Sequence, residues 1–217
     1  SYQWKADGVD ISNATNSTLT LSQDEVGKEI SVAVSYMDGG GTVETVTSTA
    51  TPAVSNVNDD PTGAVTISGT AAEDQTLTAV TTTLDDEDGL GDLSYQWLRD
   101  GSEITGATAA TYTLNQDDLG KNISVKVSYT DSYGQNESVP SAATPAVSNV
   151  NDDPTGAVTI SGTTAENQTL TAVTTTLADE DGIDTLSYQW LRSGSEIAGA
   201  TAATYTLTQD DVDTAIS

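Results

Sequence analysis

Carboxylates gathered in short clusters are the side chains of this sequence whose types and spacing suit chemistry. Two loops read Asp-x-Asp-Gly, with Asp86 and Asp88 in one and Asp179 and Asp181 in the other. This spacing offers two carboxylates on one side of a bend that the glycine permits. Such hard oxygen ligands suit Ca²⁺, which takes roughly six to eight of them. With the neighbouring acidic turns and linkers, the candidate calcium ligands are Asp24, Glu25, Asn58, Asp59, Asp60, Glu73, Asp86, Asp88, Asp117, Asp118, Asn151, Asp152, Asp153, Asp179 and Asp181.

The composition removes most other kinds of site. The 217 residues include no His and no Cys, which excludes a Ser-His-Asp triad, a thiol nucleophile, an ordinary zinc site and disulfides. Asp and Glu total 33 against 6 Lys and Arg, for a formal net charge of −27. Phosphate binding needs basic residues, so we expect no nucleic-acid partner. No run of about 18 apolar residues occurs, so we expect no insertion into a membrane.

The sequence repeats itself with a period of 93 residues. Ser-Tyr-Gln-Trp begins at Ser1, Ser94 and Ser187, and residues 58–124 differ from 151–217 at 13 of 67 aligned positions. A unit of this length is too long for a solenoid repeat and suits an independent β-sandwich. We therefore predict three segments, which are 1–57 as the C-terminal part of one repeat, 58–150 as a complete repeat and 151–217 as the N-terminal part of the next.

The complete repeat shows the pattern of an all-β domain. Trp97 and Tyr95 are expected in its core, and Pro140 marks an edge strand or a bulge. Six short strands with frequent turn signals predict tandem immunoglobulin-like Greek-key β-sandwiches. The strands are expected around 65–67, 75–84, 93–98, 111–114, 123–129 and from 137 toward 150, with a weaker one within 102–110.

This topology would bring acidic residues of neighbouring repeats to a common linker. Glu73 and the acids at 117–118 are expected at one end of a repeat, beside the outgoing linker at 151–153. The loop at 179–181 is expected at the facing end of the next repeat. So many carboxylates repel one another unless a cation lies among them. We therefore predict Ca²⁺ at this junction.

The preceding junction offers the same arrangement one period earlier, from the acids at 24–25, the linker at 58–60 and the loop at 86–88. A plainer interpretation applies to each cluster alone. Asp and Asn are common in turns because they hydrogen-bond nearby backbone, so any single cluster can be a solvated turn. The recurrence of several clusters at one junction favours the metal site.

The motifs that recur along the whole chain resemble a known family. They are Asn-Asp-Asp-Pro-Thr-Gly at 58–63, Leu-Ser-Tyr-Gln-Trp at 93–97 and Gln-Asp-Asp at 116–118. The sequence resembles the bacterial immunoglobulin-like repeats that form extender regions of giant repeats-in-toxin (RTX) adhesins. Its linker and Asp-x-Asp loop are similar to the calcium junctions of cadherins. That similarity implies one interdomain site made by Glu73, Asp117 or Asp118, Asp152, Asp153, Asp179 and Asp181.

The resemblance also implies a location and a role. It implies a secreted protein at the surface of Gram-negative bacteria, exported by a type I system, anchored at the outer membrane and active in cell adhesion and biofilms. The first functional hypothesis is a non-catalytic extender, in which Ca²⁺ at the junctions stiffens the array and holds a distal adhesive domain away from the cell. The partners are then neighbouring repeats of the same array.

Two other classes of function were compared with the extender. A Ca²⁺-dependent carbohydrate- or surface-binding module needs exposed aromatic residues or a flat Thr array on one face. Tyr133 is the one exposed aromatic residue that we nominate, and the first repeat has Gly40 at that position. An enzyme, for example a glycosidase with paired carboxylates, is not expected because the acids fall in turns.

The phase of the chain relative to the repeat leaves two interpretations open. Residues 1–57 of one chain can complete the sandwich that 151–217 of another chain begins, in a head-to-tail or swapped contact. Alternatively, the sequence is an arbitrary window on a longer array.

Overall fold

The computed structural model describes all 217 residues, and β-strands are its main regular structure. The chain divides into two compact units. The first comprises Ser1–Ala71, Gln75–Leu114 and Gly120–Val147, and the second comprises Ala72–Asp74, Asn115–Leu119 and Ser148–Ser217. None of the helices has the length and apolar character that crossing a bilayer requires. The repeat boundaries at 57/58 and 150/151 stay a prediction.

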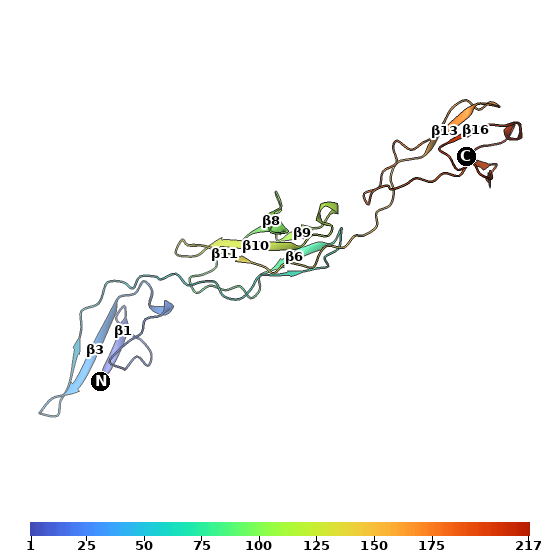
Figure 1. Cartoon of the computed structure of the whole chain (residues 1–217). Helices are drawn as coiled ribbons and strands as arrows, with labels where there is room; N and C mark the ends of the chain where they lie inside the picture. The colour runs from blue at the N-terminus through green and yellow to red at the C-terminus, as the bar shows by residue number, and fades with distance from the viewer. The chain divides into compact units, whose positions relative to one another are not determined.

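The first unit begins with an antiparallel sheet in which the N-terminus lies beside β1 and β3 (Figure 1). Asp7 and Gly8 join the first two strands with positive φ angles of 49° and 80°. This is the conformation that the tight type I′ hairpin requires. The strands are β1 (Tyr2–Ala6), β2 (Val9–Asp10), β3 (Ile30–Met37) and β4 (Val43–Thr47), in the order β2-β1-β3-β4.

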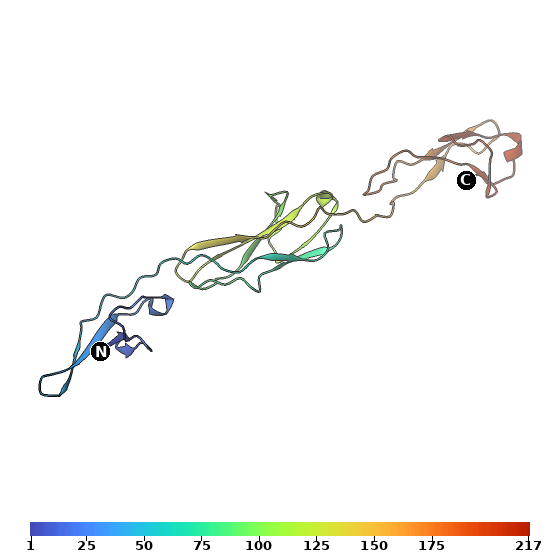
Figure 2. The ribbon, with the colours of Figure 1, turned by 60° about the horizontal axis from the view of Figure 1, so that its bottom comes forward.

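Residues 58–150 form two antiparallel sheets, seen as two layers in Figure 2. One sheet has the order β5-β6-β9, and the other has the order β11-β10-β7-β8. These are the A-B-E and G-F-C-C′ sheets of an immunoglobulin-like Greek-key sandwich, so the predicted fold class is confirmed. The strands are β5 (Thr66–Ser68), β6 (Thr76–Val80), β7 (Ser94–Arg99), β8 (Ser102–Glu103), β9 (Thr111–Thr113), β10 (Ile123–Thr130) and β11 (Asn136–Pro140).

The core of this sandwich forms where alternating residues of the two sheets face each other. Trp97 of β7 is fully buried and stacks on Tyr112 of β9, with ring centroids 5.8 Å apart. Its indole Nε1 donates a hydrogen bond to the Ala109 carbonyl over 2.9 Å, so the polar edge of the ring is satisfied. Val125 and Val127 of β10 are buried as well. Trp97 is thus a core residue, as the sequence predicted.

Three strands differ from the prediction in extent. The strand expected over 75–84 is β6, which ends at Val80. The strand expected within 102–110 has only two residues, β8, which pair with β7 beyond the Asp100-Gly101 turn. The last strand ends at Pro140 instead of continuing toward Val150. Proline has no N–H to donate, so the regular ladder ends there on the edge strand. Beyond it, the N–H groups of Ser141, Thr144 and Val147 still donate to the carbonyls of Val125, Ile123 and Lys121 at irregular spacing.

The second unit contains a smaller β-structure formed by residues 151–217. Its core consists of Leu170, Trp190 and Leu207, with Tyr205 and Ile216 packed against it. Its strands are β12 (Thr159–Ser161), β13 (Thr169–Val173), β14 (Leu191–Arg192), β15 (Ser195–Glu196) and β16 (Thr204–Thr206). Three short 3₁₀ helices mark the acidic turns of the three repeats, η1 (Gln23–Glu25), η2 (Gln116–Asp118) and η3 (Gln209–Asp211).

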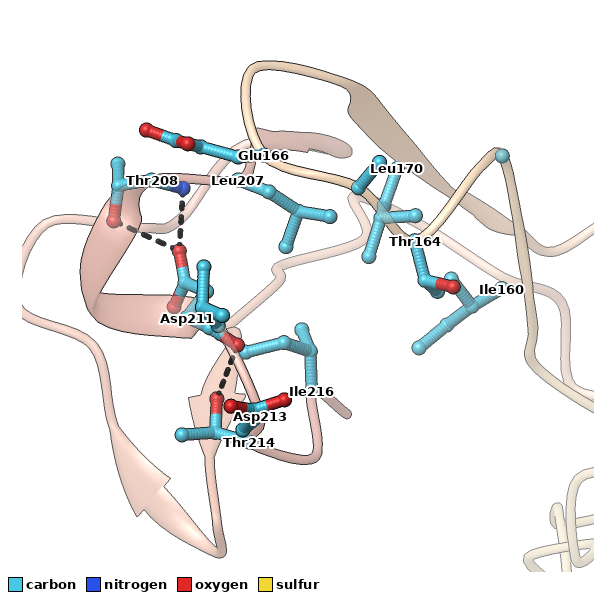
Figure 3. Close-up of a pocket in the computed structure, with 13 residues that line it drawn as sticks. Ile160, Thr164, Glu166, Leu170, Leu207, Thr208, Asp211, Asp213, Thr214 and Ile216 are labelled. Atoms are coloured by element: carbon cyan, nitrogen blue, oxygen red, sulfur yellow. Dashed lines mark hydrogen bonds between the residues drawn. The ribbon is translucent and has the colours of Figure 1, made fainter.

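The interior of residues 151–217 is open on one side. A hollow of about 530 Å³ lies among residues that include Ile160, Leu170, Leu207 and Asp211 (Figure 3). In the 93-residue register, the counterpart of β10 would start near Ile216. The hollow therefore lies beside the place where that counterpart would start, since Ile216 lines it.

Asp211 is buried at the edge of this hollow and is held by several donors. Its Oδ1 accepts hydrogen bonds from Nε and Nη2 of Arg192, each over 2.7 Å, and its Oδ2 accepts one from the Tyr205 hydroxyl over 2.8 Å. The Thr208 backbone N–H and hydroxyl also donate to Oδ2 (Figure 3). Burial alone would raise the pKa of Asp211, but these hydrogen bonds outweigh it and hold the pKa well below its usual value.

Replacing Asp211 by Asn should destabilise residues 151–217 in a pH-dependent way. Because the folded-state pKa is lowered, the ionised carboxylate contributes stability above the unfolded pKa of about 3.9, and this contribution is lost as the pH falls through the lower folded value. The variant should therefore be less stable at pH 7 and differ less from wild type in strong acid. The measurement is urea unfolding followed by the indole N–H resonance of Trp190, with Asp210→Asn as the exposed control. Equal losses of stability at both pH values would contradict this assignment.

Candidate functional site

Three carboxylates from separate parts of the sequence meet in the second unit. Candidate ligand oxygens of Glu73, Asp152 and Asp181 all lie within 4.8 Å of one another. Glu73 is only 2% exposed, Asp152 is half-buried and Asp181 is exposed. We call these three residues the Glu73 cluster. They come from an A–B turn, a linker and an Asp-x-Asp loop, which are three of the four kinds of segment that the sequence predicted to meet; the acidic turn at 117–118 contributes no carboxylate to the cluster.

Backbone hydrogen bonds hold the Glu73 cluster together. The Glu73 N–H donates to the Ser148 carbonyl over 2.9 Å, and the Val150 N–H donates to Glu73 Oε2 over 3.4 Å. The Asp152 N–H donates to Asp181 Oδ2 over 2.9 Å. These bonds fix the linker against both the turn and the loop.

The electrostatics of the Glu73 cluster are unfavourable without a cation. Burial raises the pKa of Glu73; the hydrogen bond from the Val150 N–H lowers it in part, and the charges of Asp152, Asp74 and Asp181 raise it further. Burial likewise raises the pKa of Asp152, followed by the charges of Asp181 and other acids. The ion pairs Lys5–Asp10, Lys121–Asp100, Lys126–Glu103 and Arg192–Asp211 involve other carboxylates.

A glutamine side chain ties the acidic turn to the same loop. Gln116, at the start of η2, donates from Nε2 to the Glu180 carbonyl over 2.8 Å. Its Oε1 is buried with no hydrogen-bond partner, and so is Oδ2 of Asp152. Buried polar atoms are nearly always paired, and an unpaired oxygen is satisfied only by a donor or a cation.

Within the first unit, the first Asp-x-Asp loop is bonded to its linker in the same way as the second loop is to its own. The Asp59 N–H donates to Asp88 Oδ2 over 2.8 Å, and the Asp88 N–H donates to Asp86 Oδ1 over 2.8 Å. The same two bonds join Asp152 to Asp181 and Asp181 to Asp179, one period later. Gln23 donates from Nε2 to Asp88 Oδ1 over 2.9 Å. Both aspartates of this loop, Asp86 and Asp88, are buried.

Asp131 belongs to this loop environment and was missed by the sequence analysis. It follows β10 and is 6% exposed, and its Oδ1 accepts from the N–H groups of Tyr133 and Gln135. Its Oδ2 is buried without a partner. The Ser132 N–H donates to the Asp88 carbonyl over 3.2 Å, so this turn packs on the first Asp-x-Asp loop. The available signal was Asp38, one period earlier, which makes the same turn.

Tyr129 contributes a hydroxyl to the same place. It donates to Asp86 Oδ2 over 2.5 Å, and both residues are buried. Burial raises the pKa of Tyr129, and the hydrogen bond and charge of Asp86 raise it further, followed by the charges of Glu137 and Asp131. The phenol therefore keeps its proton and remains a donor to Asp86 at neutral pH.

Other predicted ligands have different surroundings. Glu25 and Asp118 are buried in capping boxes of their own turns, where Oε2 of Glu25 accepts from Ser22 and Oδ2 of Asp118 accepts from the Asn115 N–H. The Ser22 backbone and hydroxyl donors lower the pKa of Glu25. Among the ligands predicted for the same junction, Asp117 and Asp153 are exposed and lie outside the Glu73 cluster, and the Asn151 amide donates to the Asp152 carbonyl. Among those predicted for the preceding junction, Asp24 and Asp60 are exposed, and the Asn58 amide donates to the Asp59 carbonyl.

Comparisons with known proteins give one weak structural likeness. No family model matches the chain, and no curated protein matches it. Among solved structures, it is similar to a crystal structure of titin domains, with 13% sequence identity over 67% of this chain and 54% of that chain, at a TM-score of 0.28. The chain thus spans about half the length of that titin chain. A likeness at this level carries no argument about function.

Glu73→Gln should have opposite effects with and without calcium. In chelator, the variant removes a buried negative charge that faces Asp152 and Asp181, so its melting temperature should rise above that of wild type. In Ca²⁺ it lacks a ligand, so affinity at this site should fall at least roughly tenfold, as losing even an outer-shell partner does. Melting curves and calorimetric titration measure the two effects.

The matched control for this experiment is Glu166→Gln. Glu166 occupies the equivalent position one period later and is exposed. Its replacement should change neither the melting temperature nor the affinity. A Glu73→Gln variant that behaves like this control in both conditions would show that Glu73 is not a ligand.

Proposed function

We propose that this chain is a non-catalytic extender segment whose repeats are held in line by Ca²⁺ bound at their junctions. The observation that carries the proposal is the Glu73 cluster, where three carboxylates converge next to buried oxygens that have no hydrogen-bond donor. Divalent calcium satisfies several such oxygens at once and tolerates mixed carboxylate, amide and carbonyl ligands.

The recurrence of the arrangement supports a structural role. The two Asp-x-Asp loops make the same backbone-to-carboxylate hydrogen bonds in residues of both units. Near-identical tandem units suit a spacer, because the length of the array then matters more than any single surface. The high negative charge also hinders association between neighbouring molecules.

The ligand sets can be assigned to chain segments. Glu73, Asp152 and Asp181 would hold one ion, with the Gln116 amide oxygen as a neutral candidate. Asp86 and Asp88, the equivalents of Asp179 and Asp181, would be the candidate ligands one period earlier. In this proposal the bound ion supplies positive charge and crosslinks segments, and no reaction takes place. The cellular setting that we propose is a bacterial surface adhesin, as the motif resemblance implies.

Small-angle scattering in millimolar Ca²⁺ and in excess chelator tests the proposal. At constant ionic strength, the wild-type particle should have a larger maximum dimension and be stiffer with Ca²⁺. Without the ion, repulsion between carboxylates leaves the linkers extended but flexible. The double variant Asp179→Ala, Asp181→Ala should lose part of the calcium response because one of the junctions can no longer bind the ion.

The control keeps the net charge of the double variant. Glu44→Ala with Glu196→Ala also removes two carboxylates, both exposed on strands. This control should respond to Ca²⁺ like wild type. A wild-type particle whose scattering is the same in Ca²⁺ and in chelator would refute the proposed function.

A further inference from the structure

The acidic turn at 115–118 contacts the second Asp-x-Asp loop through a neutral side chain. Gln116 Nε2 donates to the Glu180 carbonyl over 2.8 Å. An amide turned by 180° would set its oxygen against that carbonyl oxygen, so the hydrogen bond fixes the orientation of the amide. Glu180 precedes Asp181, so this bond restrains the backbone that carries one member of the Glu73 cluster. The neutral amide adds no charge to the cluster, whereas a fourth carboxylate would be repelled by the other three.

The turn presents this glutamine from a fixed backbone. Asn115 caps η2, because its Oδ1 accepts from the Asp117 N–H over 3.0 Å and its own N–H donates to Oδ2 of Asp118 over 3.0 Å. Asp118 is fully buried. The residues Asn115–Leu119 also belong to the same compact unit as the loop. Gln116 therefore orders little more than its own side chain when it binds the loop, which keeps the entropic cost of the contact small.

An equivalent glutamine makes the same kind of contact one period earlier. Gln23, at the start of η1, donates from Nε2 to Asp88 Oδ1 over 2.9 Å. Asp88 directly follows the counterpart of Glu180 in the 93-residue register. The two loops are also bound by a linker N–H, from Asp59 in one case and Asp152 in the other. Each loop is thus held from two sides, by its linker and by a glutamine of an acidic turn.

We propose that Gln116 is an ion-independent latch, which holds the acidic turn on the 179–182 loop before calcium binds and so sets the apparent calcium affinity of the Glu73 cluster. In chelator the latch acts against the repulsion between carboxylates, so a docked arrangement coexists with an open one. A ligand binds more weakly in proportion to the fraction of molecules in the competent arrangement. One hydrogen bond changes such a balance roughly fivefold. The effect on affinity rests on the proposed function, whereas the latch itself does not.

Distances between spin labels in excess chelator test the latch without any ion. The chain has no cysteine, so Ser102→Cys and Ser195→Cys place labels at two exposed, equivalent positions of β8 and β15. Gln116→Met keeps the length of the side chain and removes the donor. In this variant the ratio of docked to open molecules should fall roughly fivefold, and the distance distribution should broaden.

Calcium titration followed at the amide resonance of Asp181 measures the second effect. Gln116→Met should bind calcium roughly fivefold more weakly at the Glu73 cluster, because fewer molecules have the docked arrangement. The matched control is Gln209→Met, which changes the equivalent, exposed residue one period later. This control should behave like wild type in both measurements.

The outcomes separate the two proposals. If wild type binds no calcium, the proposed function fails, and the label distances alone decide whether the latch exists. If Gln116→Met and wild type have the same distance distribution in chelator, the latch is overturned. If the docked fraction falls but calcium affinity stays the same, the control of affinity is overturned. Equal broadening in Gln209→Met would also overturn the latch, since the effect would then not depend on the bond to Glu180.

Discussion

The constraint on which the rest of this structure depends is a set of buried side-chain oxygens that have no hydrogen-bond donor. Where the linker, the turn and the loop meet, carboxylates gather without a nearby Lys or Arg, and some buried oxygens have no partner at all. Bringing these carboxylates together in their ionised form therefore costs free energy, as the raised pKa values of Glu73 and Asp152 indicate. This is the opposite of the Arg192–Asp211 pair, in which the protein provides its own cation to a buried acid.

The same fold in each repeat places acidic segments at equivalent positions, one period apart. Each acidic segment is placed by an ordinary structural element, which is an A–B turn, a 3₁₀ turn or a loop resting on the end of a strand. The close approach of the Asp86 loop to β10 needs Gly91, where a Cβ would lie 2.0 Å from the Thr130 carbonyl oxygen. Packing of the sheets and the placement of the acids are thus not independent, since a shift of one strand end would move a carboxylate.

The features that depend on local patterns were predictable from the sequence. The alternation of Ile123, Val125, Val127 and Tyr129 indicated β10, and the acidic composition of the loops indicated the Asp-x-Asp segments. The burial of Asp131 was not predictable in the same way, because it depends on a loop that lies far away in the sequence. The capping of η1 and η2 was visible in the pattern Ser22-x-x-Glu25 and Asn115-x-x-Asp118, but their acids were interpreted as ligands. The identity and number of bound ions remain predictions, as do the repeat boundaries.

The bonds from the Asp59 and Asp152 N–H groups to the aspartates of the following loop have a practical consequence for dissecting this chain. They make each linker a structural component of the sandwich that comes after it, even before any ion binds. A fragment prepared to study one repeat should therefore start upstream of Asn58 or Asn151. A fragment that starts after Pro61 or Pro154 would lack the Asp59 or Asp152 N–H that donates to the loop. The carboxylate of Asp88 or Asp181 would then lose this hydrogen bond.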